Sequence, residues 1–300
     1  MKTIYGKHYS SPSQIIRILK SRGLAFENET EAVSYLRHIG YHKLSAYAVP
    51  FYRNPKESKL FKDGTSFGSL ISLYTFDKKP RVLLFDEIGS VEVAVRCIIA
   101  NMGCEVLCDD HWITDSSHFA DSHKFGKTLQ IIEREISSSN DNYIAHFRRH
   151  YTDNYPPAWV ITEILSFGTL NGIYSNISDY HLRKRISSHF GVMPKVLTSW
   201  LTAMSTLRNM CCHHTRVWNR HLAICPAVPA NATKPWIDSS RIDRRRLYYR
   251  LCIIKYFLNA ISPGNDMRDR LSNLFGSFPN VDLAAMGFPE GWISEPLWMM

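Results

Sequence analysis

The chain has 300 residues, of which 45% are hydrophobic, 12% aromatic and 21% charged. This composition excludes an intrinsically disordered chain and is typical of a packed globular protein with one or two domains. The formal net charge of +9 favours a polyanionic partner such as a nucleic acid.

Two further features bear on the cellular compartment. No apolar run approaches the roughly 18 residues of a membrane span and no secretory leader is recognisable, so we expect a cytoplasmic protein without a membrane partner. The chain has seven cysteines. Because that number is odd and no leader is seen, reduced thiols are favoured over a disulfide framework.

The first elements in chain order are two short predicted helices between Pro12 and Gly40, each closed by a glycine. Residues 41–67 follow, rich in aromatic residues and interrupted by two prolines. That pattern indicates an irregular or hairpin-like connection, in which a minor β-hairpin is allowed. We therefore predict an N-terminal helical lobe with its connection over residues 1–66.

The clearest long helix is predicted from about residue 69 to residue 101, with Pro80 as a candidate break. Its apolar residues recur at spacings of three and four, as on one face of a helix. Glu92 and Arg96 stand four apart on this helix, in the acid-first order that stabilises it. A surface ion pair is the ordinary interpretation of such a pair, and a polar pair that helps to line a site is the alternative.

Further helices are predicted along the rest of the chain. They fall at residues 127–139, from the double proline at 156–157 to Gly168, at 180–191, from Pro194 through residue 220, and within 238–261. A tail punctuated by glycine and proline ends the chain. The fold class predicted is all-α, with a helical core and insertion over 67–225 and a C-terminal basic helix and tail over 226–300.

The segment at residues 207–220 reads LRNMCCHHTRVWNR and combines two cysteines, two histidines and three arginines. If it is helical, at about 100° per residue, polar side chains form a stripe on one side. The stripe consists of Asn209, His213, Arg216 and Arg220. Arg208 flanks it, whereas His214 is expected to face the apolar interior.

Three functions compete for this stripe: a metal site, a basic surface that binds phosphate, and a catalytic Arg/His pair. Metal binding fits poorly, because the adjacent Cys211 and Cys212 point in different helical directions and no matched pair of ligands accompanies them. A basic face with a partly exposed histidine is the ordinary interpretation, since Arg-x4-His occurs on many solvated helices. No metal or other cofactor is therefore predicted.

Arg208 and His213 nevertheless suit the cleavage of RNA. Histidine moves protons near neutral pH, and arginine offers a planar fork of donors for phosphate oxygens. A base could take the proton of a 2′-hydroxyl, whose oxygen then attacks the neighbouring phosphorus while cations stabilise the anion. The expected products carry a 2′,3′-cyclic phosphate and a 5′-hydroxyl.

The sequence RNMCCHH at 208–214, followed by TRVWNR, resembles the Arg-Asn-x-x-x-His signature of the HEPN superfamily, as found in Abi-like proteins of the AbiD and AbiF abortive-infection group. Further similar segments stand in order along the chain. They are YHKLSAYAVPF at 41–51, LYTFDKKPRVLLFDEIGSVEVAVRCIIA at 73–100, PPAWVITEILSFGTL at 156–170 and MGFPEGW at 286–292. The resemblance implies an all-helical HEPN core and a composite ribonuclease site, usually formed by one motif from each subunit of a homodimer.

The resemblance also assigns roles to residues. Arg208 and His213 correspond to the first and last positions of the motif and Asn209 to its second. His213 is predicted to be the general base or acid, Arg208 the phosphate and transition-state clamp, and Asn209 the residue that orients them. The supporting residues are Glu92, Arg96, Arg216 and Arg220. The implied role is a toxin-like RNA cleavage that defends bacteria against phage, in some AbiF relatives together with a small noncoding RNA.

The alternative is a non-catalytic RNA-binding protein, the partner of a noncoding RNA, that uses the same basic surface. Two basic clusters and an aromatic residue that stacks on bases, Tyr248 or Tyr249, would add contacts. These residues are Arg183, Lys184, Arg185, Arg244, Arg245, Arg246 and Tyr248. A solvated face is the ordinary explanation of such clusters. A structural protein whose basic face meets an acidic partner is a third interpretation.

Overall fold

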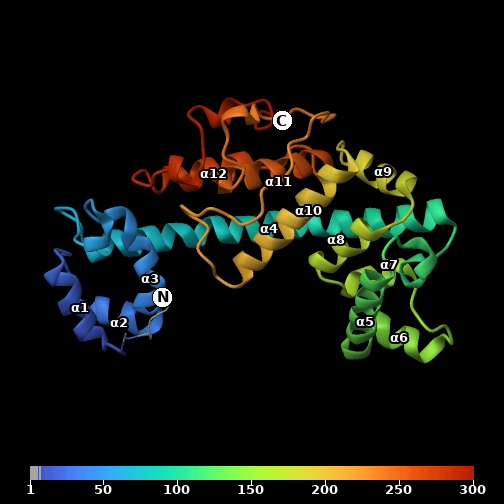
Figure 1. Cartoon of the computed structure of the whole chain (residues 1–300), viewed down its shortest axis with the longest axis horizontal. Coiled ribbons are helices and arrows are strands. Elements are labelled where there is room, and N and C mark those ends of the chain that lie inside the picture. The colour runs from blue at the N-terminus through green and yellow to red at the C-terminus, as the bar shows by residue number, and fades with distance from the viewer. Residues whose placement is uncertain (1–5, 7) are drawn as a thin grey trace. The chain divides into compact units, whose positions relative to one another are not determined.

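The structure, a computed structural model, describes residue 6 and residues 8–300. The described residues form twelve α-helices and several short 3-10 turns, without a strand, so the predicted all-α class is confirmed (Figure 1). The other N-terminal residues, within the stretch where the sequence predicts no leader, lie outside the described part. None of the described helices has both the length and the apolarity that a membrane span needs.

The chain divides into two compact units, Met1–Lys79 and Pro80–Met300. The three segments that the sequence suggests, 1–66, 67–225 and 226–300, stay a prediction. In the first unit lie three short helices and the beginning of a long one: α1 (Pro12–Ser21), α2 (Glu29–His38), α3 (Tyr41–Ala48) and α4 (Phe67–Leu107).

The two predicted N-terminal helices are confirmed, and local capping explains where they begin. The Ser11 hydroxyl accepts the backbone N–H of Gln14, whose side chain in turn accepts the N–H of Ser11. Asn28 accepts the N–H of Glu31 at the start of α2. These caps satisfy backbone donors that have no partner within the helix.

The irregular connection predicted after Gly40 is wrong in its first part, because α3 occupies it. Leu44, Tyr47 and Ala48 are buried at helical spacing, and the Tyr47 hydroxyl donates to Asp77 at 2.7 Å. The many aromatic residues of this segment favoured an irregular connection, so the short buried helical face of α3 was not predicted. A single antiparallel bridge between Tyr52 and Phe61 stands where a hairpin was allowed, without strands.

The long helix α4 continues through Pro80. Proline cannot donate a backbone hydrogen bond and its ring crowds the preceding turn, which makes Pro80 a candidate break in the sequence. The buried face continues on both sides, since Phe76 and Leu84 are both fully enclosed. The apolar residues that recur at this spacing are fully buried, as expected: Leu84, Ile88, Val91, Val95 and Ile99.

Eight more helices follow α4 in the second unit. They are α5 (Ser122–Ser138), α6 (Asn142–His150), α7 (Ala158–Ile164), α8 (Phe167–Asn176), α9 (Tyr180–His189), α10 (Pro194–Cys212), α11 (Leu247–Ile261) and α12 (Met267–Gly276). Helix α10 packs against α8, α9 and α11, and α5 packs against α7 and α8. Every residue of α11 from Leu247 to Asn259 is buried, so α11 forms a central part of this unit's core.

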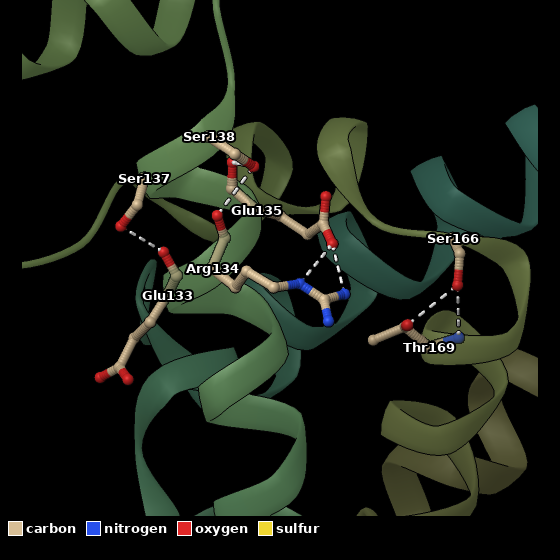
Figure 2. A network of polar contacts seen from close by, with 7 residues as sticks. All are labelled: Glu133, Arg134, Glu135, Ser137, Ser138, Ser166 and Thr169. Atoms are coloured by element: carbon tan, nitrogen blue, oxygen red, sulfur yellow. Dashed lines mark hydrogen bonds and ion pairs between the residues drawn. The ribbon is translucent and has the colours of Figure 1, made fainter.

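The single helix predicted after the double proline is wrong, because two helices, α7 and α8, occupy that stretch. Ser166 interrupts it: its hydroxyl accepts the N–H of Thr169 at 3.2 Å and starts α8 (Figure 2). Leu165, just before it, has extended backbone and ends α7. Figure 2 also shows the end of α5, where Ser137 donates to the carbonyl of Glu133.

Candidate active site

Helix α10 ends within the segment that the sequence singled out. His213 is its C-cap, and the His213 N–H still donates to the Asn209 carbonyl at 3.0 Å. His214 then adopts a left-handed backbone with φ of 53°. Its N–H donates to the Cys211 carbonyl at 3.1 Å, and the N–H of Thr215 donates to the Met210 carbonyl at 2.9 Å. This pair of bonds is the Schellman motif that commonly terminates helices.

The polar stripe predicted on one helix is therefore correct as far as His213 and wrong beyond it. The backbone turns at His214, so Arg216 and Arg220 lie in the irregular segment that follows. Arg216 is half-buried and Arg220 exposed. His214 is exposed as well, not directed into the core as expected. The two adjacent histidines thus form the end of the helix, one as cap and one as left-handed turn.

Arg208 lies against α4. Its Nε is 3.7 Å from Oε2 of Glu92, and its guanidinium carbon lies 5.7 Å from the centroid of the Phe85 ring. A guanidinium over an aromatic face is attracted by the negative face of the ring. The Arg208 side chain is 35% exposed, so it is fixed on one side and open to solvent on the other.

Glu92 stands between two arginines. Its Oε1 accepts a hydrogen bond from Nη2 of Arg96 at 3.3 Å, while its Oε2 faces Arg208. The side chains of Glu92 and Arg96 are only 11% and 13% exposed. The interpretation of this pair as a surface ion pair is therefore wrong. The nearly buried Glu92 instead contacts the side of Arg208 that faces α4, while Arg96 binds the other oxygen of the same carboxylate.

Arg96 extends the network toward α7. Its Nη2 donates to the carbonyl of Leu165 at 3.2 Å, and its Nη1 lies 3.7 Å from Oε2 of Glu163. The carbonyl is within reach because the chain is extended at Leu165. Four alternating charges thus run from Arg208 through Glu92 and Arg96 to Glu163. Sequence reasoning missed Glu163, since it did not predict the break between α7 and α8.

Asn209 and His213, the other two residues of the predicted catalytic set, are exposed at the end of α10. Arg208 faces α4, whereas neither Asn209 nor His213 takes part in its contacts with Glu92 and Phe85. The described structure thus brings Glu92, Arg96 and Arg208 together and leaves His213 at the surface. An exposed imidazole at this position is accessible to a large ligand or to a second protein molecule.

The first predicted RNA-binding cluster lies on α9. Arg183 is half-buried with its guanidinium over the ring of Tyr174, 6.0 Å from the centroid. Lys184 is exposed, and Arg185 forms an ion pair with Glu105. Arg183 and Arg185 already have partners for their charges. Among the described residues, no contact engages the charge of Lys184.

The second predicted cluster precedes α11. Arg244 donates to the Pro226 carbonyl at 2.9 Å, and Arg246 donates to Asn219 at 3.1 Å. Both therefore hold the irregular segment after α10 in place, while Arg245 is exposed.

The proposed role of Tyr248 in stacking on bases is wrong. Its side chain is fully buried, where its ring packs against Phe288 and Trp298 at centroid distances of 4.8 and 6.4 Å. The helix that carries Tyr248 is buried on all sides, so the basic start of that segment did not indicate an exposed aromatic face.

One group of described side chains could hold a metal ion, away from α10. It comprises Asp109, Asp115 and His118, whose ligand atoms all lie within 4.8 Å of one another. Nε2 of His118 is 3.3 Å from Oδ2 of Asp109. The backbone N–H of Ser117 lowers the pKa of Asp115, which keeps this carboxylate ionised. Exposed acidic groups of this kind are common without a metal.

The described residues are helical or irregular throughout, and the Arg-Asn-x-x-x-His segment closes α10. The sequence model described as Abi-like protein matches residues 34–219. The chain belongs to the Abi-like protein family. The matched range includes the candidate site and excludes α11 and α12. Comparison with curated proteins and with solved structures gave no match.

Proposed function

We propose that this Abi-like protein is a metal-independent endoribonuclease of the HEPN superfamily, in the AbiD and AbiF group, which acts in the cytoplasm during antiphage abortive infection. Family membership supports the abortive-infection role. The observation that carries the ribonuclease assignment is the position of Arg208. It is held by the nearly buried Glu92 and remains partly open to solvent, five residues before the exposed His213.

Arg208 is the proposed phosphate clamp. The carboxylate of Glu92 engages Nε, which leaves the two terminal amino groups of the guanidinium to bind phosphate oxygens. Contacts with Glu92 and Phe85 restrict the side chain before RNA arrives. A donor fixed in advance stabilises developing charge without the cost of ordering it during the reaction.

His213 is the proposed general base or acid. In the base role, the imidazole takes the proton of an RNA 2′-hydroxyl while the oxygen attacks the adjacent phosphorus. The bond from phosphorus to the 5′-oxygen breaks, and a proton donor completes the 5′-hydroxyl. The products are a 2′,3′-cyclic phosphate and a 5′-hydroxyl end. Asn209, exposed one turn earlier, is the proposed residue that orients the RNA or the imidazole.

A homodimer completes the proposal. In one molecule Arg208 faces α4 and His213 is exposed at the helix end, so a second copy of this helix end can supply the facing motif. Two motifs brought together would give one site with two arginines and two histidines. A twofold dimer, which pairs identical surfaces, is the commonest arrangement of soluble oligomers.

The test is incubation of the purified protein with labelled single-stranded RNA in EDTA, followed by analysis of the product ends. We expect cyclic-phosphate ends from the unaltered protein. The loss in Arg208→Ala should be about 100-fold or more, and similar in His213→Ala. Arg37→Ala and His42→Ala, at exposed positions of α2 and α3, serve as matched controls. Cleavage that survives in both site variants, or that requires a metal, would overturn the proposal.

The second candidate is an RNA-binding protein without catalysis, which the exposed Lys184 and Arg245 favour. It predicts that RNA stays intact yet shifts in a gel, and that binding weakens in Lys184→Ala and Arg245→Ala. Retained binding with complete loss of cleavage in His213→Ala would instead favour the enzyme.

A further inference from the structure

A cavity of about 820 Å³ lies in the second unit, away from the end of α10. It is formed by α6, by residues just after α4 and by the beginning of α7, which Figure 1 places in its green region. Its volume is within the range of ligand-binding pockets in proteins. The lining that matters here consists of Tyr143, His146, Phe147, Arg149, Tyr151 and Trp159.

Aromatic side chains dominate this lining and remain open to solvent. Tyr143, Tyr151 and Trp159 are 41%, 55% and 45% exposed. The Phe147 and Tyr151 rings stack at 5.4 Å, and the His146 ring lies 6.0 Å from Tyr151. Large aromatic residues usually bury their faces, so several exposed ones around a single cavity indicate a surface that binds a ligand.

Cations accompany the rings. Arg149 lines the cavity together with the imidazole of His146 and the carboxylates of Asp110 and Asp153, and the last turn of α6 also carries Arg148. Cations at a helix C-terminus are ordinarily explained by the helix dipole, but that effect does not place aromatic rings beside them. Flat rings next to cations match a nucleotide, whose base stacks and whose phosphate is negative.

The cavity borders the charge network that leads to Arg208. Trp159 and Glu163 stand four apart on α7, which puts them on one face of the helix, and Glu163 pairs with Arg96. Burial raises the pKa of Tyr143; the charges of Asp141 and Glu163 raise it further, and Arg96 lowers it. Tyr143 therefore lies within electrostatic range of Glu163 and Arg96, and Trp159 lies one helical turn from Glu163.

We propose that this cavity binds unstacked bases of single-stranded RNA and so holds the chain beside the Glu163, Arg96, Glu92 and Arg208 network. The identity of the ligand as RNA rests on the proposed function. Bases would stack on Trp159 and Tyr151, while Arg149 meets the backbone phosphates. Because these rings are exposed, the cavity can admit a nucleotide that remains part of a longer strand.

The test measures binding of a fluorescein-labelled 2′-O-methyl RNA by fluorescence anisotropy. This probe lacks the attacking hydroxyl, so binding is measured without cleavage. We expect Trp159→Ala and Tyr151→Ala each to weaken binding by roughly tenfold, since a stacked base contributes strongly. Trp159→Phe, which keeps an aromatic face, should retain most of the affinity. Tyr9→Ala, at a tyrosine that is 87% exposed in the other unit, is the matched control and should bind normally.

Two further probes, an abasic oligomer and a free mononucleotide, separate base stacking on the rings from phosphate binding and from binding of a small molecule. An abasic oligomer of equal charge should bind the unaltered protein and Trp159→Ala alike, and weakly. Equal affinity of the abasic and parent oligomers would overturn the proposal, as would absence of binding or unchanged binding in both ring variants. A free mononucleotide that binds as tightly as the oligomer would identify a small-molecule site and also overturn it.

The outcomes distinguish this proposal from the ribonuclease assignment. Binding that depends on Trp159, with native RNA left intact, supports the cavity and removes the enzyme function. Cleavage of native RNA with unchanged binding in both Trp159→Ala and Tyr151→Ala supports the enzyme function and removes the cavity proposal. Circular dichroism of each variant confirms that a loss of binding is not a loss of folding.

Discussion

The carboxylate of Glu92 lies 3.7 Å from Nε of Arg208, so a nearly buried acid on α4 orients a partly exposed arginine on α10. The same carboxylate also binds Arg96. Glu92 is therefore a positioning residue for the proposed clamp, because it acts through Arg208 and does not need to touch RNA.

Glu92→Gln should lower RNA cleavage roughly 10- to 100-fold, since the amide keeps the shape but loses the charge that orients Arg208. Binding of the 2′-O-methyl RNA should change far less than cleavage. A purely structural role would lower both together, as measured alongside thermal unfolding. Glu105→Gln, which removes the charge of an exposed partner of Arg185, is the matched control. Cleavage at the unaltered rate would show that Arg208 does not depend on Glu92.

His214→Gly should stabilise the protein by about 1 kcal/mol, because a left-handed backbone costs every residue except glycine. The position has a φ of 53° at the C′ site of the Schellman motif. Urea denaturation measures the change. His213→Gly, at a φ of −84°, should instead be neutral or destabilising. A destabilised His214→Gly would mean that the imidazole contributes contacts larger than the backbone strain.

Gly103→Ala should destabilise the protein by about 2 kcal/mol or more, because an added Cβ would lie 2.2 Å from the buried Trp112 ring. Gly89 lies on the same helix with nothing within 4 Å of the equivalent position. Gly89→Ala should therefore stabilise by roughly 0.5–1 kcal/mol through helix propensity alone. Thermal unfolding of both variants checks the opposite signs, and equal effects would contradict the packing of Trp112 on α4.

Burial raises the pKa of the Cys104 thiol to about 11, and the charges of Asp110 and Asp109 contribute. At pH 8 roughly one Cys104 thiol in a thousand is ionised, so alkylation should be slow and should accelerate up to about pH 11. Cys212, exposed at the end of α10, is the internal comparison. Mass spectrometry after iodoacetamide treatment measures both sites. Faster alkylation of Cys104 than of Cys212 at pH 8 would contradict the burial.

The same shift affects folding. The thiol ionises more easily in the unfolded chain than in the folded one. Its contribution to stability is therefore complete below about pH 8.5 and is lost as the pH rises toward about 11.

Much of the fold was predictable because periodicity and capping are local. The start of α1, the apolar face of α4 and the start of α10 at Pro194 follow from spacing and from residues that favour helix ends. The break at Ser166 and the helix α3 were missed. Serine also occurs inside helices, and the aromatic residues of α3 resemble those of an irregular loop.

The site was predictable only in part, for two physical reasons. A helix end is usually marked by glycine in a left-handed conformation, and here His214 takes that place, so the predicted helix runs past the observed end of α10. The contact between Glu92 and Arg208 joins residues distant in sequence, which periodicity does not reveal. The burial of Tyr248 follows from the tertiary enclosure of α11 and has no local signal.

The range that identifies the family stops before a helix on which α10 depends. Trp200 of α10 packs its ring against Tyr256 and Phe257 of α11, at 5.3 and 5.9 Å. A chain cut after residue 219 would keep the Arg-Asn-x-x-x-His segment and lose this support. The matched range and the compact unit Pro80–Met300 therefore end at different places, and we expect a fragment chosen by the match alone to expose the apolar side of α10 and to aggregate.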